Sequence, residues 1–231
     1  PDALDGPWGF FAVQGGGLSP EKVSQGFGKI WTIAEPGVSI KPYPCGVLTH
    51  PTIDLMLKLV TDNNVKPDDI EAVKVYAGTN ILNPIRYPIA GNHLQAKFSL
   101  PAALAMIALA RKAGKHEFSD QFVGSPAMQA MQRTITTEFD PEIEKLGFDK
   151  MRSRITIQLK NKTTVEGWAD ERYRGGPDNP MTDGELEAKA RSCCAGVLDD
   201  KAIASLIETG WDVTRLSDAR KLMKILNRVQ E

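Results

Sequence analysis

The sequence predicts an α+β fold, with a compact mixed region between an aromatic-rich start and a helical end. Three observations support this. Apolar residues at helical spacing follow Pro51, residues 70–77 alternate between apolar and polar side chains, and residues 154–172 alternate on both sides of an Asn161-Lys162 turn. Helices and strands that pack as layers on one hydrophobic core define this fold class.

The first regular element is expected to be a helix from Pro51 to about Thr61. Proline suits a first helical position, and the apolar residues recur at i, i+3, i+4 and i+7. These residues are Ile53, Met56, Leu57 and Val60. After a turn near Pro67, the alternation predicts a half-buried strand over Ile70 to Ala77, and the proline- and glycine-rich residues 82–93 are expected to form a loop.

A second helix is expected from Leu100 to Ala113, with Ser99 as its N-cap and Gly114 at its end. It is apolar nearly all round, which is typical of a buried helix. A shorter helix over residues 125–134 and the hairpin follow, so the region contains two or three strands. Beyond Gly175-Gly176-Pro177 the chain becomes helical: Thr182 and Glu185 form a capping box, and residues 202–207 and 219–225 predict two more helices.

This order predicts three segments. Residues 1–38 contain a Gly15–Gly17 run and five aromatic residues, whose apolar surface is expected to pack on another part of the protein. Residues 39–174 form the α+β region, and residues 175–231 form the helical end. The first and last segments can belong to one helical domain, with the α+β domain inserted between them. Such apolar surface also predicts self-association or binding to a partner.

Composition excludes several classes of function. The 28 basic residues are balanced by 29 acidic residues, giving a net charge of -1, and no basic run is long enough to follow a phosphate backbone, so nucleic acid is not an expected partner. No apolar run approaches the ~20 residues that span a bilayer, and the first residues lack the features of a signal peptide. A cytoplasmic protein is therefore expected.

The cysteine and histidine spacing predicts neither disulfides nor a metal site. Cys193 and Cys194 are neighbours whose side chains diverge on a helix, and the third cysteine, Cys45, has no histidine within three residues to activate it. The three histidines form no ligand pair typical of zinc. We therefore expect no metal and no cysteine nucleophile.

Three stretches of sequence resemble those of a known family. They are KPYPCGVLTHPTID from Lys41, QAKFSLPAALA from Gln95 and GGPDNPMTDGELEAK from Gly175, called here the first, second and third signature stretches. Their sequence and order are similar to the MmgE/PrpD family, which includes 2-methylcitrate dehydratase, cis-aconitate decarboxylase and iminodisuccinate epimerase. The resemblance covers nearly the whole chain.

The resemblance implies the C-terminal half of a family member: the end of an all-helical domain, an α+β lid domain, and helices that return to the helical domain. It also implies chemistry without metal or cofactor, in which a proton moves next to a carboxylate of a small di- or tricarboxylic acid. The expected partners are that acid and either a second copy in a homodimer or the helical domain.

The resemblance also points to site residues. Lys41 matches the family's active-site lysine, which can anchor a carboxylate or act as an acid or base. Without the resemblance, Lys41 would be interpreted as a solvated loop lysine. His50 is the second catalytic candidate, and a substrate contact and a capping or loop role are equally compatible with its place before Pro51.

Four further residues are candidates for substrate binding. Gln95, Lys97 and Ser99 precede a buried helix, where side chains and free N–H groups could bind a carboxylate. Ser99 can equally be a plain N-cap. Arg86, in the proline-rich loop, can clamp a carboxylate or be an ordinary exposed arginine.

Two departures from the family pattern bear on the reaction. The dehydratase and decarboxylase branches are expected to have a histidine near Gly46 and often a tyrosine near Ala102, and this sequence has neither. Family catalysis also draws residues from the helical domain. Two hypotheses follow: a family enzyme completed by that domain, or a truncated lid that acts as a non-catalytic interaction module.

Overall fold

The computed structural model describes residues 2–15 and 19–226, which form two compact units, Pro1–Val38 and Ser39–Glu231. Part of the predicted glycine run, Gly16 and Gly17, lies outside the described residues. The first unit contains the short helices α1 (Asp2–Asp5), α2 (Phe10–Gly15) and α3 (Pro20–Ser24). Its aromatic side chains are largely exposed, 91% for Trp8 and 89% for Phe27. That they pack on another part of the protein stays a prediction.

A four-stranded sheet organises the second unit and confirms the predicted α+β class. The strands are β1 (Ile70–Ala77), β2 (Ile135–Phe139), β3 (Ser153–Leu159) and β4 (Thr164–Trp168), in the order β2-β1-β3-β4. Strands β1 and β2 are parallel, with Val73 opposite Ile135, and the other pairs are antiparallel. Lys162 takes a positive φ of 72° in the turn between β3 and β4, as the predicted hairpin requires.

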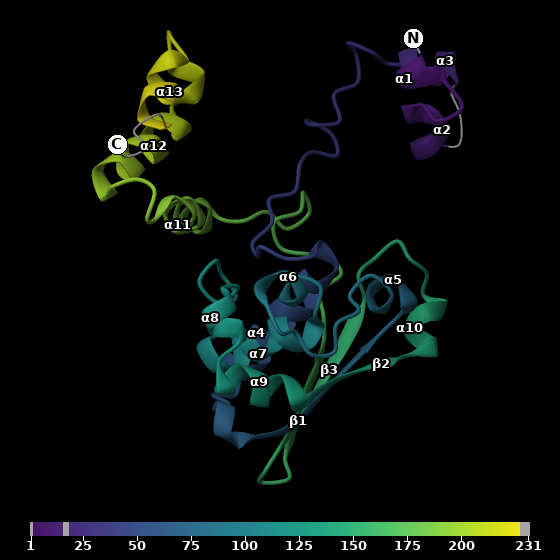
Figure 1. Ribbon diagram of the computed structural model, residues 1–231, viewed down its shortest axis with the longest axis vertical. Coiled ribbons are helices and arrows are strands. Elements are labelled where there is room, and N and C mark those ends of the chain that lie inside the picture. Colours follow the sequence, from purple (N-terminus) through teal and green to yellow (C-terminus); the bar gives the residue numbers. More distant parts are fainter. Residues whose placement is uncertain (1, 16–18, 227–231) are drawn as a thin grey trace. The chain divides into compact units, whose positions relative to one another are not determined.

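Three helices pack on one face of this sheet (Figure 1): α4 (His50–Asp62), α7 (Leu100–Ala110) and α9 (Pro126–Arg133). The core lies between them and the alternating buried residues of β1 and β3. Its fully buried side chains include Ile53, Met56, Leu104, Ile107, Val73, Val75, Ile155 and Ile157. Each large apolar side chain buried in this way contributes about 1.5–3 kcal/mol.

Helix α7 is buried as predicted but ends earlier than Ala113. Arg111 adopts a left-handed backbone conformation with φ of 53° and donates its N–H to the carbonyl of Ile107. Its guanidinium donates to Thr61 Oγ1 at 3.1 Å and to the carbonyl of Val65 at 2.9 Å. These contacts with the end of α4 stabilise a backbone conformation that arginine rarely adopts, and so end the helix before Gly114.

The other helices are short or belong to the C-terminal part of the chain. They are α5 (Thr79–Leu82), α6 (His93–Ala96), α8 (Asp120–Val123), α10 (Pro141–Lys145), α11 (Asp183–Cys194), α12 (Asp200–Trp211) and α13 (Arg220–Leu226). The predicted capping box of α11 is confirmed, because Thr182 Oγ1 accepts from the N–H of Glu185 and the Glu185 carboxylate accepts from the N–H of Thr182. None of the helices in the described ranges is long and apolar enough to cross a bilayer.

Gly175 joins the start of the second unit to the end of the α+β region. Its φ is +87°, its carbonyl accepts from the N–H of Ile40 at 2.8 Å, and a Cβ at this position would lie 2.0 Å from the Ile40 carbonyl oxygen. Gly175→Ala is therefore expected to destabilise the unit by about 2 kcal/mol, from left-handed strain and the clash together. Urea unfolding at pH 7 measures this.

The matched control is Gly184→Ala on α11. A Cβ there would meet nothing within 4 Å, and the backbone is helical. This variant is expected to be neutral or stabilising by up to about 1 kcal/mol. Equal free energies of unfolding for the two variants would contradict the role given to Gly175.

Candidate functional site

The loop from Lys41 to Thr49 brings the first signature stretch against the second. The backbone N–H of Gly46 donates to the carbonyl of Lys97 at 2.9 Å. Lys41 is exposed, and its Nζ donates to the carbonyl of Cys45 at 3.2 Å. Among the described residues, no carboxylate pairs with Lys41 within ion-pair distance. Its ammonium group is therefore free to bind an external anion.

Gly46 occupies the place where two branches of the family are expected to carry a histidine. A Cβ on Gly46 would lie 3.1 Å from Ile85 Cδ1 and 3.4 Å from the Lys97 carbonyl oxygen. A larger side chain therefore fits only if Ile85 moves.

Cys45, within this loop, and His50, directly after it, are both buried. Burial raises the pKa of the Cys45 thiol to about 11, while Thr49 and Lys41 oppose the shift, so Cys45 is a neutral thiol at pH 7. Its Sγ lies 3.2 Å from Thr49 Oγ1. This environment agrees with the expectation that Cys45 is not a nucleophile.

His50 is the first residue of α4 and has no exposed surface. Burial lowers its pKa to about 4; the Cys45 carbonyl opposes the shift, and the charges of Lys41, Arg174 and Lys189 add to it. Neither ring nitrogen forms a hydrogen bond of normal geometry with any described residue. The imidazole is thus neutral at pH 7 and packs edge-on against the ring of Tyr43, with 5.4 Å between ring centroids.

The second signature stretch uses most of its polar groups to build local structure. Ser99 is fully buried and is the N-cap of α7, since its Oγ accepts from the N–H of Ala102 at 3.1 Å. The Gln95 side chain accepts from the N–H of Gly91 at 2.8 Å. Lys97, which is half-buried, has a side chain that makes no ion pair within the described ranges. Of these three candidates, Lys97 has the side chain most available to a ligand.

Arg86 is exposed in the loop between α5 and α6, and this loop is held in two places. The N–H of Tyr87 donates to the carbonyl of Phe98 at 3.2 Å, which pairs the loop with the second signature stretch. Farther along, the buried side chain of Gln132 on α9 accepts from the N–H of Ala90 at 2.8 Å. The three cations Lys41, Arg86 and Lys97 thus lie on three segments joined by backbone hydrogen bonds.

Arg174, which no sequence pattern indicated, joins the first signature stretch to the third. Its guanidinium donates to Asp54 Oδ1 at 3.0 Å, to the hydroxyl of Tyr43 at 2.9 Å and to Glu185 Oε1 at 2.7 Å. Tyr43 in turn donates to Asp54 at 2.5 Å. Burial, together with the charge of Asp54, raises the pKa of Tyr43 well above its usual value, so the hydroxyl keeps its proton. The only sequence signal was an arginine beside the Gly175-Gly176 break.

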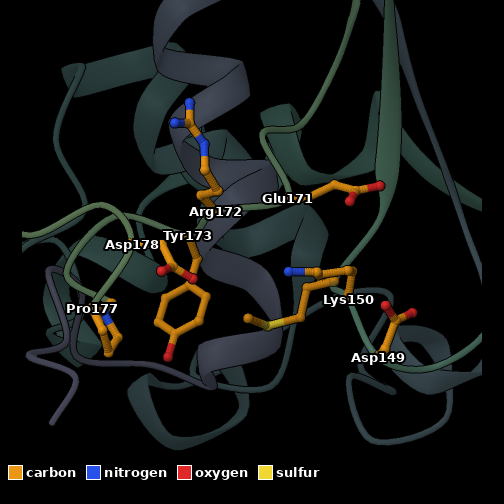
Figure 2. Close-up of a pocket in the computed structure, with 9 residues that line it drawn as sticks. Asp149, Lys150, Glu171, Arg172, Tyr173, Pro177 and Asp178 are labelled. Carbon is orange, nitrogen blue, oxygen red and sulfur yellow. The ribbon is translucent and has the colours of Figure 1, made fainter. Parts of the chain in front are cut away.

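A small cavity of about 100 Å³ lies beside the third signature stretch (Figure 2). Its lining mixes both signs of charge, with Asp149, Glu171 and Asp178 near Lys150 and Arg172. Asp149 and Glu171 are paired with Arg152 at 2.8 and 2.6 Å. In Figure 2 the Arg172 side chain points away from Lys150 and Asp149. Because three carboxylates and two cations line it, this space offers no free cation cluster to a carboxylate.

A second cavity, of about 520 Å³, lies between α4 and the end of β4, where Asp54, Lys58, Trp168, Asp170 and Arg172 line it. Its charges are also paired, Lys58 with Asp62 and Arg172 with Asp170. None of the six residues predicted from the sequence lines either cavity. Within the described residues, no group of three or more His, Cys, Asp or Glu side chains is arranged to hold a metal ion.

Comparison with known proteins identifies the domain type. A family model described as the MmgE/PrpD C-terminal domain matches residues 43–213, well over half of the chain. This span contains the whole sheet, all but two residues of the first signature stretch, and the second and third stretches complete. No curated protein matches the chain.

Proposed function

The chain belongs to the MmgE/PrpD family through its C-terminal domain, and on this premise we propose that it is the lid-side half of a cofactor-independent lyase or isomerase. The substrate is a small di- or tricarboxylic acid, as for 2-methylcitrate dehydratase. The reaction transfers a proton at a carbon next to a carboxylate, and a substrate of the 2-methylcitrate type would place the protein in propionate metabolism.

One observation supports this proposal: Lys41, Arg86 and Lys97 lie on three segments that are joined by backbone hydrogen bonds. The backbone hydrogen bonds from Gly46 to Lys97 and from Tyr87 to Phe98 hold these segments side by side. A di- or tricarboxylic acid needs several cations that are not already neutralised, and no ion pair within the described residues involves these three. Charge-assisted hydrogen bonds from such groups fix the position of the carboxylates.

Each cation has a distinct role in the proposal. Lys41 anchors the carboxylate next to the reacting carbon and stabilises the negative charge that develops when the proton leaves. Arg86 can bind a second carboxylate through two parallel N–H groups, and Lys97 adds a further point charge. Gln95 and Ser99 position this surface by capping the loop and α7.

His50 contributes in another way. It is neutral and covered by the Lys41 loop, so it can reach a substrate only when the loop moves. The aromatic side chains exposed in the first unit support association with a helical domain or with a second copy as a homodimer, since water tolerates such surface poorly. The site does not require a secretory or membrane location, and we propose a cytoplasmic one.

The test is a panel of acids incubated with the complete protein and excess EDTA, followed by NMR. The panel contains 2-methylcitrate, cis-aconitate and iminodisuccinate, one for each reaction type. Conversion of at least one acid without added metal or cofactor is expected. If the complete protein converts none, the non-catalytic interaction module becomes the better account.

A further inference from the structure

Two adjoining cavities lie at the C-terminal end of α7 and together form one groove. A cavity of about 490 Å³ is lined by Arg111, Lys112, Lys115, Glu117 and Arg174, among others. A second, of about 280 Å³, shares Lys115 and Arg174 with it and reaches Lys189 on α11. We call this space the basic groove and define its cations as Arg111, Lys112, Lys115, Arg174 and Lys189.

Most of these cations lack a carboxylate partner. Only Arg174 is neutralised, by Asp54 and Glu185. Arg111 donates to neutral oxygens, Thr61 Oγ1 and the Val65 carbonyl, which hold the side chain in place without removing its charge. Lys112, Lys115 and Lys189 make no ion pair with any described residue.

Charges on the protein compensate these cations only in part. Glu117 lines the groove and its carboxylate accepts from the N–H of Gly114 at 2.8 Å. The C-terminal end of α7 adds the equivalent of about half a negative charge. The five cations of the groove therefore face three carboxylates, Glu117 and the two that share Arg174, and about half a negative charge from the helix end, so positive charge remains in excess. A concave surface of one sign concentrates counter-ions of the other sign more strongly than a flat surface does.

The cations of the groove are not those of the proposed reaction, although Pro42, next to Lys41, lines both cavities. Lys97 and Ser99 precede the first residue of α7, whereas Arg111 and Lys112 follow its last residue. A helix of this length spans about 16 Å at 1.5 Å per residue. A ligand in the groove is thus too far away to be bound by Lys97 or Ser99 at the start of the same helix.

We infer that the basic groove is a second binding site, which takes a compact anion carrying two or more charged oxygen groups. A phosphorylated metabolite and a polycarboxylate share this chemistry. Arg111 and Arg174 are held rigidly by their hydrogen bonds and form the fixed part of the site. Lys112 and Lys115 on one side and Lys189 on the other are the adjustable part. The cations of this site differ from Lys41, Arg86 and Lys97, the cations of the proposed reaction.

The experiment is isothermal titration of the purified chain with inorganic pyrophosphate and, separately, with propane-1,2,3-tricarboxylate. One ion is expected to bind per chain. Lys115→Gln and Lys189→Gln are each expected to weaken this binding by about 10-fold or more, because each removes one charge-assisted hydrogen bond. Binding of pyrophosphate alone would identify the ligand class as phosphorylated, and binding of the tricarboxylate alone would identify it as polycarboxylate.

Two control variants make the result specific. Lys160→Gln removes an exposed lysine near the β3–β4 turn and is expected to change affinity by less than about 2-fold. Lys41→Ala removes a cation that does not line the groove and is expected to weaken this binding less than Lys115→Gln does. The inference is overturned if neither ion binds, if Lys160→Gln weakens binding as much as Lys115→Gln, or if Lys41→Ala abolishes it.

Discussion

Arg174→Ala is expected to lower the free energy of unfolding of the Ser39–Glu231 unit by about 3 kcal/mol, near the lower limit for breaking a buried ion pair. The variant leaves Asp54 with one partner, the Tyr43 hydroxyl, and removes the link to Glu185. The Arg174 and Asp54 side chains are 27% and 28% exposed, and solvent screening keeps the effect from being larger.

Urea unfolding at pH 7 measures this effect, and Arg172→Ala is the matched control. Arg172 is 63% exposed and pairs only with its near neighbour Asp170, so its loss is expected to cost less than about 1 kcal/mol. Arg174→Lys keeps the positive charge but lacks the planar guanidinium with its several N–H donors. This variant is expected to recover only part of the lost free energy of unfolding. If Arg172→Ala and Arg174→Ala lower the free energy of unfolding by the same amount, the contacts of Arg174 between the signature stretches do not stabilise the unit.

Lys41→Ala is expected to lower kcat/KM of the complete protein by about 10- to 150-fold, corresponding to the loss of a charge-assisted hydrogen bond worth about 1.5–3 kcal/mol. A catalytic proton transfer through Lys41 would increase the loss further. Stability is expected to change by less than about 0.5 kcal/mol, because the side chain is exposed and its one bond is to a carbonyl.

Lys58→Ala is the control for this variant. Lys58 lies on α4, is 71% exposed and pairs with Asp62 one turn away, a contact that contributes little to stability. Its removal is expected to leave kcat/KM unchanged. Unchanged kinetics for Lys41→Ala as well would exclude Lys41 from the site and leave it a loop lysine.

The elements that the sequence predicts well are those whose bounds are set by residues close together in the chain. Strand β1 has the predicted bounds, and α4 differs from its prediction by one residue at each end, because hydrophobic period and proline placement are local signals. The left-handed conformation of Arg111 was not predictable, since it depends on contacts with Thr61 and Val65, about 50 residues earlier.

The candidate site shows the same limit. Lys41 and Lys97 could be identified from their signature stretches, but the hydrogen bond that joins their loops could not. Arg174 was missed because its partners Tyr43, Asp54 and Glu185 come from three elements and carry no spacing signal. The sequence predicted that a helix begins directly after His50, and His50 is the first residue of α4. Its complete burial arises from packing between the loop and α4 and could not be predicted.

The most direct test of the proposed function is solvent-deuterium incorporation, measured by NMR with the complete protein in D₂O. Dehydration run as hydration, decarboxylation and epimerisation each deliver a solvent proton to a carbon next to a carboxylate. With an acid that is converted by hydration, decarboxylation or epimerisation, deuterium is expected at one such carbon, about 10-fold or more slowly with Lys41→Ala and at the wild-type rate with Lys58→Ala. Conversion without any deuterium at that carbon, or equal rates in all three proteins, would contradict the proposed proton transfer at the Lys41 site.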